Sequence, residues 1–117
     1  MESRFIPVAS VGELDQLLAR SRDATVVLFK HSNACPISAA AYQQMKGLDE
    51  DVAIVVVQKA REVSREVEAR TGVRHETPQT LLLRGGRAVW SASHWDITSE
   101  SVADALREQQ QEGATGE

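Results

Sequence analysis

Residues 25–47 read TVVLFKHSNACPISAAAYQQMKG, an apolar run followed by a cysteine and then by helix-forming residues. Residues 25–29 are β-branched, aliphatic or aromatic without a break, which is typical of a short strand buried on both faces. Pro36 has the fixed φ that suits a first helical turn, and the helix formers after it end at Gly47. Cys35 is therefore predicted to lie at the N-terminus of a helix, directly after a central strand.

The sequence predicts further elements on both sides of this unit. A short strand at 5–8 precedes a helix at 11–20, whose start carries the capping-box pattern of Ser10 with Glu13. After the cysteine-bearing helix we predict a strand, a helix, two strands and a helix, at residues 52–57, 61–71, 80–83, 88–90 and 99–109. The strand–helix–strand segment predicts a parallel pair, and the turn at Gly85-Gly86 predicts an antiparallel hairpin.

The length and the order of these elements predict one α/β domain. At 117 residues the chain is long enough for one core and too short for two ordinary domains. We expect the domain at 1–110, a polar disordered tail at 111–117, and a central mixed sheet of four to five strands flanked by helices. A βαβ start joined to a ββα end, with a cysteine after a central strand and a proline before the hairpin, resembles the thioredoxin fold over about residues 5–110.

Composition excludes several classes of partner. Hydrophobic residues make up 42% of the chain and charged residues 26%, and the net charge is -4 without a continuous basic stripe. No apolar run approaches the roughly 20 residues that span a bilayer, and the N-terminus lacks the apolar segment of a signal peptide. We therefore expect a cytoplasmic monomer that binds neither nucleic acid nor membranes.

The chain has a single cysteine, so no disulfide can form within it. This fits a reducing compartment. The three histidines, His31, His75 and His94, are scattered and lack the spacing of a zinc site together with Cys35. We expect neither a metal nor a bound cofactor.

Cys35 is the candidate nucleophile. Free amides at a helix N-terminus favour negative charge on sulfur, and the thiolate is the reactive form. The alternative is a small buried hydrophobic residue, which is the usual role of a free cysteine.

Two neighbouring residues are candidates to support the site. Pro36 supports it because this proline begins the helix that carries Cys35. Ser38 stands where a dithiol redox protein carries its second cysteine, so any redox mechanism must use one thiol. Ser38 either donates a hydrogen bond to the sulfur or satisfies amides of its own helix.

The resemblance to the thioredoxin fold also implies a role for a second segment. In that fold a loop ending in a cis proline opens the strand that faces the reactive cysteine. The resemblance implies that Pro78 is this proline and that the backbone of Thr77 pairs with the substrate. The alternative is an ordinary loop proline, since only about 5–6% of X–Pro bonds are cis.

Four motifs give a narrower resemblance, to the YtxJ-like monothiol bacilliredoxins. They are FKHSNACPIS at 29–38, VVQKAR at 56–61, HETPQ at 75–79 and SHWDIT at 93–98. The resemblance implies removal of the small thiol bacillithiol from S-bacillithiolated client proteins, with Cys35 attacking the mixed disulfide. Bacillithiol is then a co-substrate, and bacillithiol or another redoxin is the reductant. Ala34 departs from the expected pattern, because we expect a threonine beside the cysteine.

The resemblance brings further candidates into the site. Bacillithiol carries two malate carboxylates, which Lys30 or Arg74 could orient by charge-assisted hydrogen bonds, although surface cations more often only solvate the protein. A charged His31 could promote the thiolate, but a role in stabilising the loop is favoured. Trp95 follows the last strand, is hard to explain as core, and is a candidate to flank the cleft.

Two other functions remain open from the sequence. One is a binding module that shares an iron–sulfur cluster between two chains, as monothiol glutaredoxin-like proteins do. Pro36 argues against it, because those proteins carry a glycine after the cysteine. The other is a redox sensor or adaptor in which Cys35 is modified once and then recruits a partner.

Overall fold

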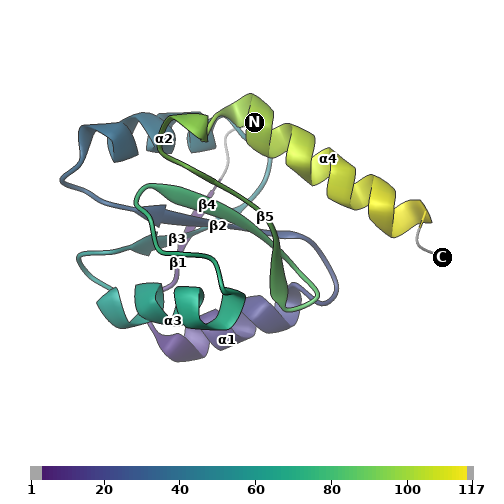
Figure 1. Ribbon diagram of the computed structural model, residues 1–117, viewed down its shortest axis with the longest axis horizontal. Helices are drawn as coiled ribbons and strands as arrows, with labels where there is room; N and C mark the ends of the chain where they lie inside the picture. The colour runs from purple at the N-terminus through teal and green to yellow at the C-terminus, as the bar shows by residue number, and fades with distance from the viewer. Residues whose placement is uncertain (1–3, 116–117) are drawn as a thin grey trace.

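The computed structural model describes residues 4–115, which form a five-stranded sheet flanked by four α-helices (Figure 1). In chain order the elements are β1 (Phe5–Pro7), α1 (Val11–Arg20), β2 (Val26–His31), α2 (Pro36–Lys46), β3 (Val52–Val56), α3 (Arg61–Thr71), β4 (Gln79–Arg84), β5 (Arg87–Ser93), the 3₁₀ helix η1 (His94–Asp96) and α4 (Ser99–Thr115). None of these helices is long and apolar enough to cross a membrane.

The strands follow the order β1-β3-β2-β4-β5 across the sheet. β3 pairs in parallel with both β1 and β2, whereas β4 pairs antiparallel with β2 and β5. The predicted α/β class with a mixed sheet is therefore confirmed, as are the parallel crossover and the antiparallel hairpin. In the register of β2 with β4, Lys30 faces Gln79. The loop that follows β2 and the loop that precedes β4 consequently leave the same edge of the sheet.

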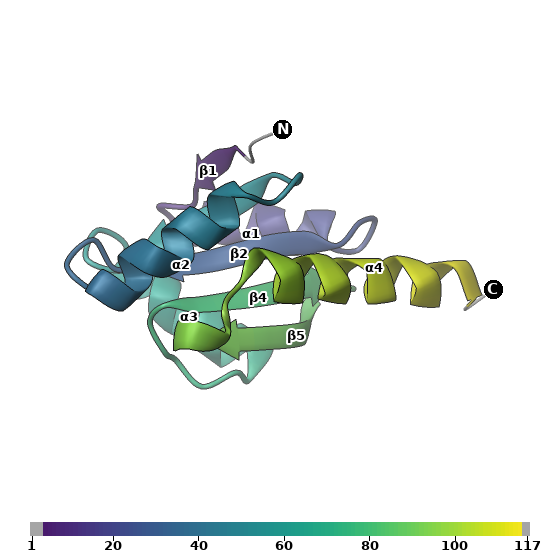
Figure 2. The ribbon, with the colours of Figure 1, turned by 90° about the horizontal axis from the view of Figure 1, so that it is seen from above.

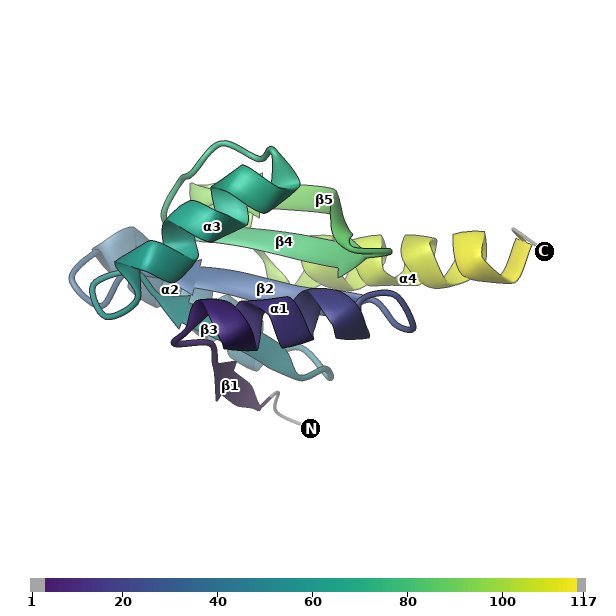
Figure 3. The same ribbon diagram turned by 90° about the horizontal axis from the view of Figure 1, so that it is seen from below.

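The two faces of the sheet carry separate cores. Figure 2 shows α2 and α4 over one face, and Figure 3 shows α1 and α3 over the other. The central strands are apolar on both faces: in β2, Phe29 packs on the side of α2 and α4, while Leu28 packs on the side of α1 and α3. Since side chains alternate along a strand, Lys30 shares the face of Leu28.

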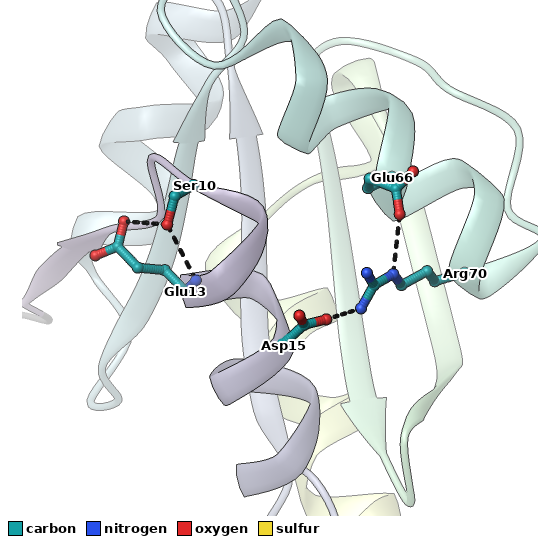
Figure 4. Close-up of polar contacts among 5 residues, drawn as sticks. All are labelled: Ser10, Glu13, Asp15, Glu66 and Arg70. Atoms are coloured by element: carbon teal, nitrogen blue, oxygen red, sulfur yellow. Dashed lines mark hydrogen bonds and ion pairs between the residues drawn. The ribbon is translucent and has the colours of Figure 1, made fainter.

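Local polar contacts fix the start of α1 and its position beside α3 (Figure 4). The Ser10 hydroxyl oxygen accepts from the Glu13 amide at 3.1 Å, and the Glu13 carboxylate accepts from the Ala9 amide at 3.0 Å, so the predicted cap is present. Arg70 of α3 pairs with Asp15 of α1 and with Glu66 one turn earlier in its own helix. These ion pairs reach solvent, so they orient the helices more than they stabilise the protein.

Glycine sets two of the chain reversals. Gly85 and Gly86 have φ of 66° and 78°, the pair of positive values that a type I′ hairpin turn requires. Gly72 ends α3 with φ of 73°, as the sequence predicted.

The last helix is longer than predicted. α4 runs to Thr115 rather than to residue 109, so it includes residues 111–115 of the segment expected to be a disordered tail. Gln111, Glu112 and Ala114 are good helix formers, which favours continuation of the helix past residue 109 despite Gly113. Residues 116–117 of the expected tail lie outside the described residues.

Candidate functional site

Cys35 is the N-cap residue of α2. Its backbone is extended, with φ of -116° and ψ of 122°, and its carbonyl accepts from the Ala39 amide at 3.0 Å. Pro36 occupies the first turn, as predicted. The thiol is free and half-buried, and within residues 4–115 no hydrogen bond reaches its sulfur. The backbone amides of the first helical turn lack intrahelical acceptors.

Ser38 has neither of the two roles expected from the sequence. Its side chain is fully buried, and its oxygen accepts from the Ser32 amide at 2.9 Å and lies 2.8 Å from Nδ1 of His31. It therefore binds the loop before Cys35 rather than the sulfur or the amides of its own helix. The reason is the chain reversal between β2 and α2, which brings residues 31–32 back over the first turn of the helix.

Gln58 holds the same loop from the other side. Its amide nitrogen donates to Ser32 Oγ at 2.7 Å, and its amide oxygen accepts from the Asn33 backbone at 3.2 Å. Ser32 Oγ also accepts from the Ala34 amide at 3.3 Å. Sequence reasoning missed Gln58, although it lies within one of the four motifs. Its role depends on β3 placing residue 58 beside the end of β2, which the sequence pattern alone does not specify.

His31 is a packed and neutral side chain. Its ring lies 5.5 Å from that of Phe29 and 5.2 Å from that of Tyr42, measured between ring centroids. Burial lowers the pKa of His31, and its hydrogen bond to Ser38 offsets this only in part. The imidazole is therefore uncharged at neutral pH, which fits the favoured role in stabilising the loop and not a charged partner for Cys35.

The loop that precedes β4 ends in a cis peptide bond between Thr77 and Pro78. Pro78 is buried, and no hydrogen bond engages the Thr77 backbone within residues 4–115. The Thr77 hydroxyl lies 3.2 Å from Nε2 of His75. Because the loops after β2 and before β4 leave one edge of the sheet, the arrangement brings the Thr77–Pro78 segment to the same edge as Cys35.

Trp95 lies at this edge as well. The His94 amide donates to the Pro78 carbonyl at 3.0 Å, so η1 is attached directly to the cis-proline loop, and η1 also packs against α2. The Trp95 side chain is 69% exposed. The exposed indole therefore lies outside the core, beside the segment that contains Pro78.

Lys30 is not available for the direct ligand contact that the sequence suggested. Its side chain is fully buried under α3, and its Nζ has no hydrogen-bond partner in the described part of the chain. Burial lowers its pKa to about 8, an effect that the charge of Glu68 opposes. Arg74, the other candidate cation, is exposed, and its carbonyl accepts from the Gln79 side chain at 2.9 Å.

Comparison with known proteins assigns the family. The sequence profile described as monothiol bacilliredoxin BrxC matches residues 6–102. The chain belongs to the monothiol bacilliredoxin family. A solved structure described as a putative oxidoreductase with a thioredoxin fold is 34% identical, with a TM-score of 0.80, and the match covers 86% of this chain and 92% of that one. Together the family and this neighbour support a thiol oxidoreductase.

More distant structures confirm the fold. Reduced thioredoxin from Schistosoma mansoni is 18% identical with a TM-score of 0.68, and the match covers 91% of this chain and 98% of that one. Thioredoxin from Trypanosoma brucei brucei is 14% identical with a TM-score of 0.74, and the match covers 92% of this chain and 91% of that one. Both the predicted thioredoxin-like fold and the resemblance to the monothiol bacilliredoxins are therefore confirmed.

The surface of this bacilliredoxin is hollowed both near the candidate site and away from it. The larger, of about 660 Å³, borders Ala24, Thr25 and Val26 at the start of β2, and so lies at the opposite end of that strand from the Cys35 loop. The smaller, of about 410 Å³, lies along α3 and is bordered by Gln58, Arg61, Arg65 and His75 among others. The smaller hollow therefore adjoins the candidate site. Within the described part of the chain, no three His, Cys, Asp or Glu side chains are grouped to hold a metal ion.

Proposed function

We propose that the protein is a monothiol thiol–disulfide oxidoreductase that removes bacillithiol from S-bacillithiolated proteins, with Cys35 as the nucleophile. The observation that carries the proposal is a single half-buried thiol at the start of α2, with a buried serine where a second thiol would stand. Membership of the monothiol bacilliredoxin family supports the choice of substrate.

The reaction consists of two thiol exchanges. In the first, the Cys35 thiolate attacks the bacillithiol sulfur of the mixed disulfide, a Cys35–bacillithiol disulfide forms, and the client leaves as a thiolate. In the second, the thiolate of free bacillithiol or of another redoxin attacks this new disulfide and releases the Cys35 thiolate. The client disulfide is reduced, and the incoming thiol is oxidised to a disulfide with bacillithiol. No bound cofactor takes part.

The edge of the sheet beside Cys35 provides the client-binding surface. The unengaged backbone of Thr77 can pair with an extended client segment, and Pro78 keeps the cleft open beside the sulfur. Trp95 borders the same edge and covers the client with its exposed indole. On this proposal the protein acts in the cytoplasm as a monomer, without nucleic acid or membranes as partners.

The test is the release of bacillithiol from a client protein that carries one S-bacillithiolated cysteine. Native protein with free bacillithiol as reductant should restore the client thiol over many equivalents per chain, and the Cys35→Ser variant should restore none. Release by the variant would overturn the role of Cys35. Release of a single equivalent per chain would favour a sensor that is modified once over a catalyst.

A further inference from the structure

We propose that the hollow along α3 is a subsite for the carboxylates of the small-thiol half of the mixed disulfide. The inference rests on the proposed function and deepens it, because it assigns the part of the protein that distinguishes an acidic small thiol from a neutral one. Its occupant is the dicarboxylate end of bacillithiol, held while Cys35 attacks the sulfur.

The hollow is joined to the Cys35 loop through one side chain. Gln58 borders the hollow, and the same amide group contacts Ser32 Oγ at 2.7 Å and the Asn33 amide at 3.2 Å. The loop held in this way leads directly to Cys35. The volume of about 410 Å³ lies within the range of roughly 300–1,000 Å³ typical of small-molecule sites.

Two arginines give the hollow its positive charge. Arg61 and Arg65 are one helical turn apart on α3, so both border the hollow from one face of the helix. Within residues 4–115, neither guanidinium has an ion-pair or hydrogen-bond partner. Free guanidinium groups match carboxylates with two parallel hydrogen bonds each, so a pair of them suits a dicarboxylate.

The other polar groups that line the hollow do not cancel the positive charge of the two arginines. Glu68 is its only acidic member among the described residues, and its carboxylate accepts from the His75 amide at 2.8 Å. His75 is itself fixed by Ser64, whose oxygen lies 3.2 Å from Nδ1. Burial lowers the pKa of His75, and the charge of Lys30 lowers it further, so the imidazole adds no charge at neutral pH.

Lys30 is the independent indication of an anionic occupant. Its ammonium group is fully buried, has no hydrogen-bond partner among residues 4–115, and lies close enough to Glu68 to interact with its charge and close enough to His75 to oppose protonation of that ring. An unpaired buried charge is costly, and a single glutamate that already accepts a backbone hydrogen bond offsets it only in part. Lys30 does not line the hollow itself, but Glu68 and His75 do, so a carboxylate bound there would lie within the range of its charge and offset the rest.

The experiment compares two mixed disulfides on one client cysteine, one with bacillithiol and one with β-mercaptoethanol, which carries no carboxylate. The test protein is the double variant Arg61→Gln/Arg65→Gln. The matched control is Arg22→Gln/Arg87→Gln, which removes the same charge from exposed arginines outside the hollow. We expect the test variant to release bacillithiol at least about tenfold more slowly than the native protein. Its rate on the mercaptoethanol disulfide and both rates of the control should change less than about twofold.

Two outcomes overturn the subsite. Unchanged release of bacillithiol would show that the arginines do not contact it. An equal loss on both disulfides would show that they act on Cys35 or on an acidic surface of the client. A native protein that releases neither thiol refutes the proposed function itself. Added L-malate gives a second readout: it should inhibit the native protein on the bacillithiol disulfide and have no effect on the double variant.

Discussion

The Ser38 hydroxyl oxygen lies 2.8 Å from Nδ1 of His31 and also accepts from the Ser32 amide at 2.9 Å. The residue that stands in place of a second thiol thus fastens the end of β2 to the first turn of α2. The serine has a structural reason to be buried at this position, which is independent of any contact with the Cys35 sulfur.

Replacing Ser38 with alanine should destabilise the fold. The Ser32 amide and the His31 ring would each lose a buried partner, and we expect the free energy of unfolding to fall by about 1–3 kcal/mol. Urea unfolding monitored by circular dichroism measures this change. The matched variant Ser91→Ala removes an exposed hydroxyl on β5 and should leave the midpoint unchanged. Equal stability of the two variants would contradict the structural role of Ser38.

His31 should make the protein less stable in mild acid. Because burial lowers its pKa in the fold, the unfolded chain binds the proton more readily. The neutral form contributes stability above about pH 6.5, the ordinary pKa of histidine, and this contribution is lost as the pH falls below that value. The free energy of unfolding of the native protein should therefore drop more steeply between pH 7 and pH 5 than that of His31→Gln. His75 also has a lowered pKa, so the stability of His31→Gln should still depend on pH in this range, but less steeply. Parallel pH profiles would contradict this account.

Lys30→Met should be more stable than the native protein. The variant removes a buried unpaired ammonium whose pKa is about 8 instead of the ordinary 10.5, and at about 1.4 kcal/mol per pKa unit we expect a gain of about 3 kcal/mol at pH 7. In the native protein the cost is fully present below its pKa of about 8 and is relieved as the pH rises toward the ordinary lysine value. The gain should thus shrink between pH 8 and pH 10. Exposed Lys59→Met is the control, and a loss of stability in Lys30→Met at pH 7 would refute the interpretation.

Trp95→Ala should affect protein clients more than small disulfides. The indole is exposed beside the Pro78 loop and makes no core contact that its loss would disrupt. We expect KM for an S-bacillithiolated client to rise about five- to tenfold, while the rate of Cys35 with bacillithiol disulfide stays within about twofold. Trp90→Phe is the comparison variant: its ring packs against the core, so the substitution should not change KM for the client selectively. An equal loss on both substrates would exclude Trp95 as a client contact.

The sequence was informative where the signal is local. The helices at 11–20 and 61–71 begin and end where capping residues and Gly72 predicted, and Pro36 placed Cys35 at the start of α2. Each of these depends on neighbouring residues and on their backbone preferences. The long apolar run of β2 similarly predicted a strand buried on both faces.

The parts that were missed depend on contacts between distant segments. Lys30 follows four apolar residues and reads as the polar end of a strand, yet pairing with β4 and coverage by α3 bury it completely. Gln58 and Arg65 acquire their positions only when α3 packs beside the loop before Cys35. Ser38 could be identified as a residue of the site, but its partners lie across a chain reversal.

The most direct test of the central claim is the intact mass of the reduced protein after mixing with bacillithiol disulfide and, separately, with glutathione disulfide. We expect a bacillithiol adduct that forms faster than the glutathione adduct, is absent from Cys35→Ser, and disappears when a reducing thiol is added. The absence of an adduct with either disulfide would show that Cys35 is unreactive and would contradict the monothiol mechanism.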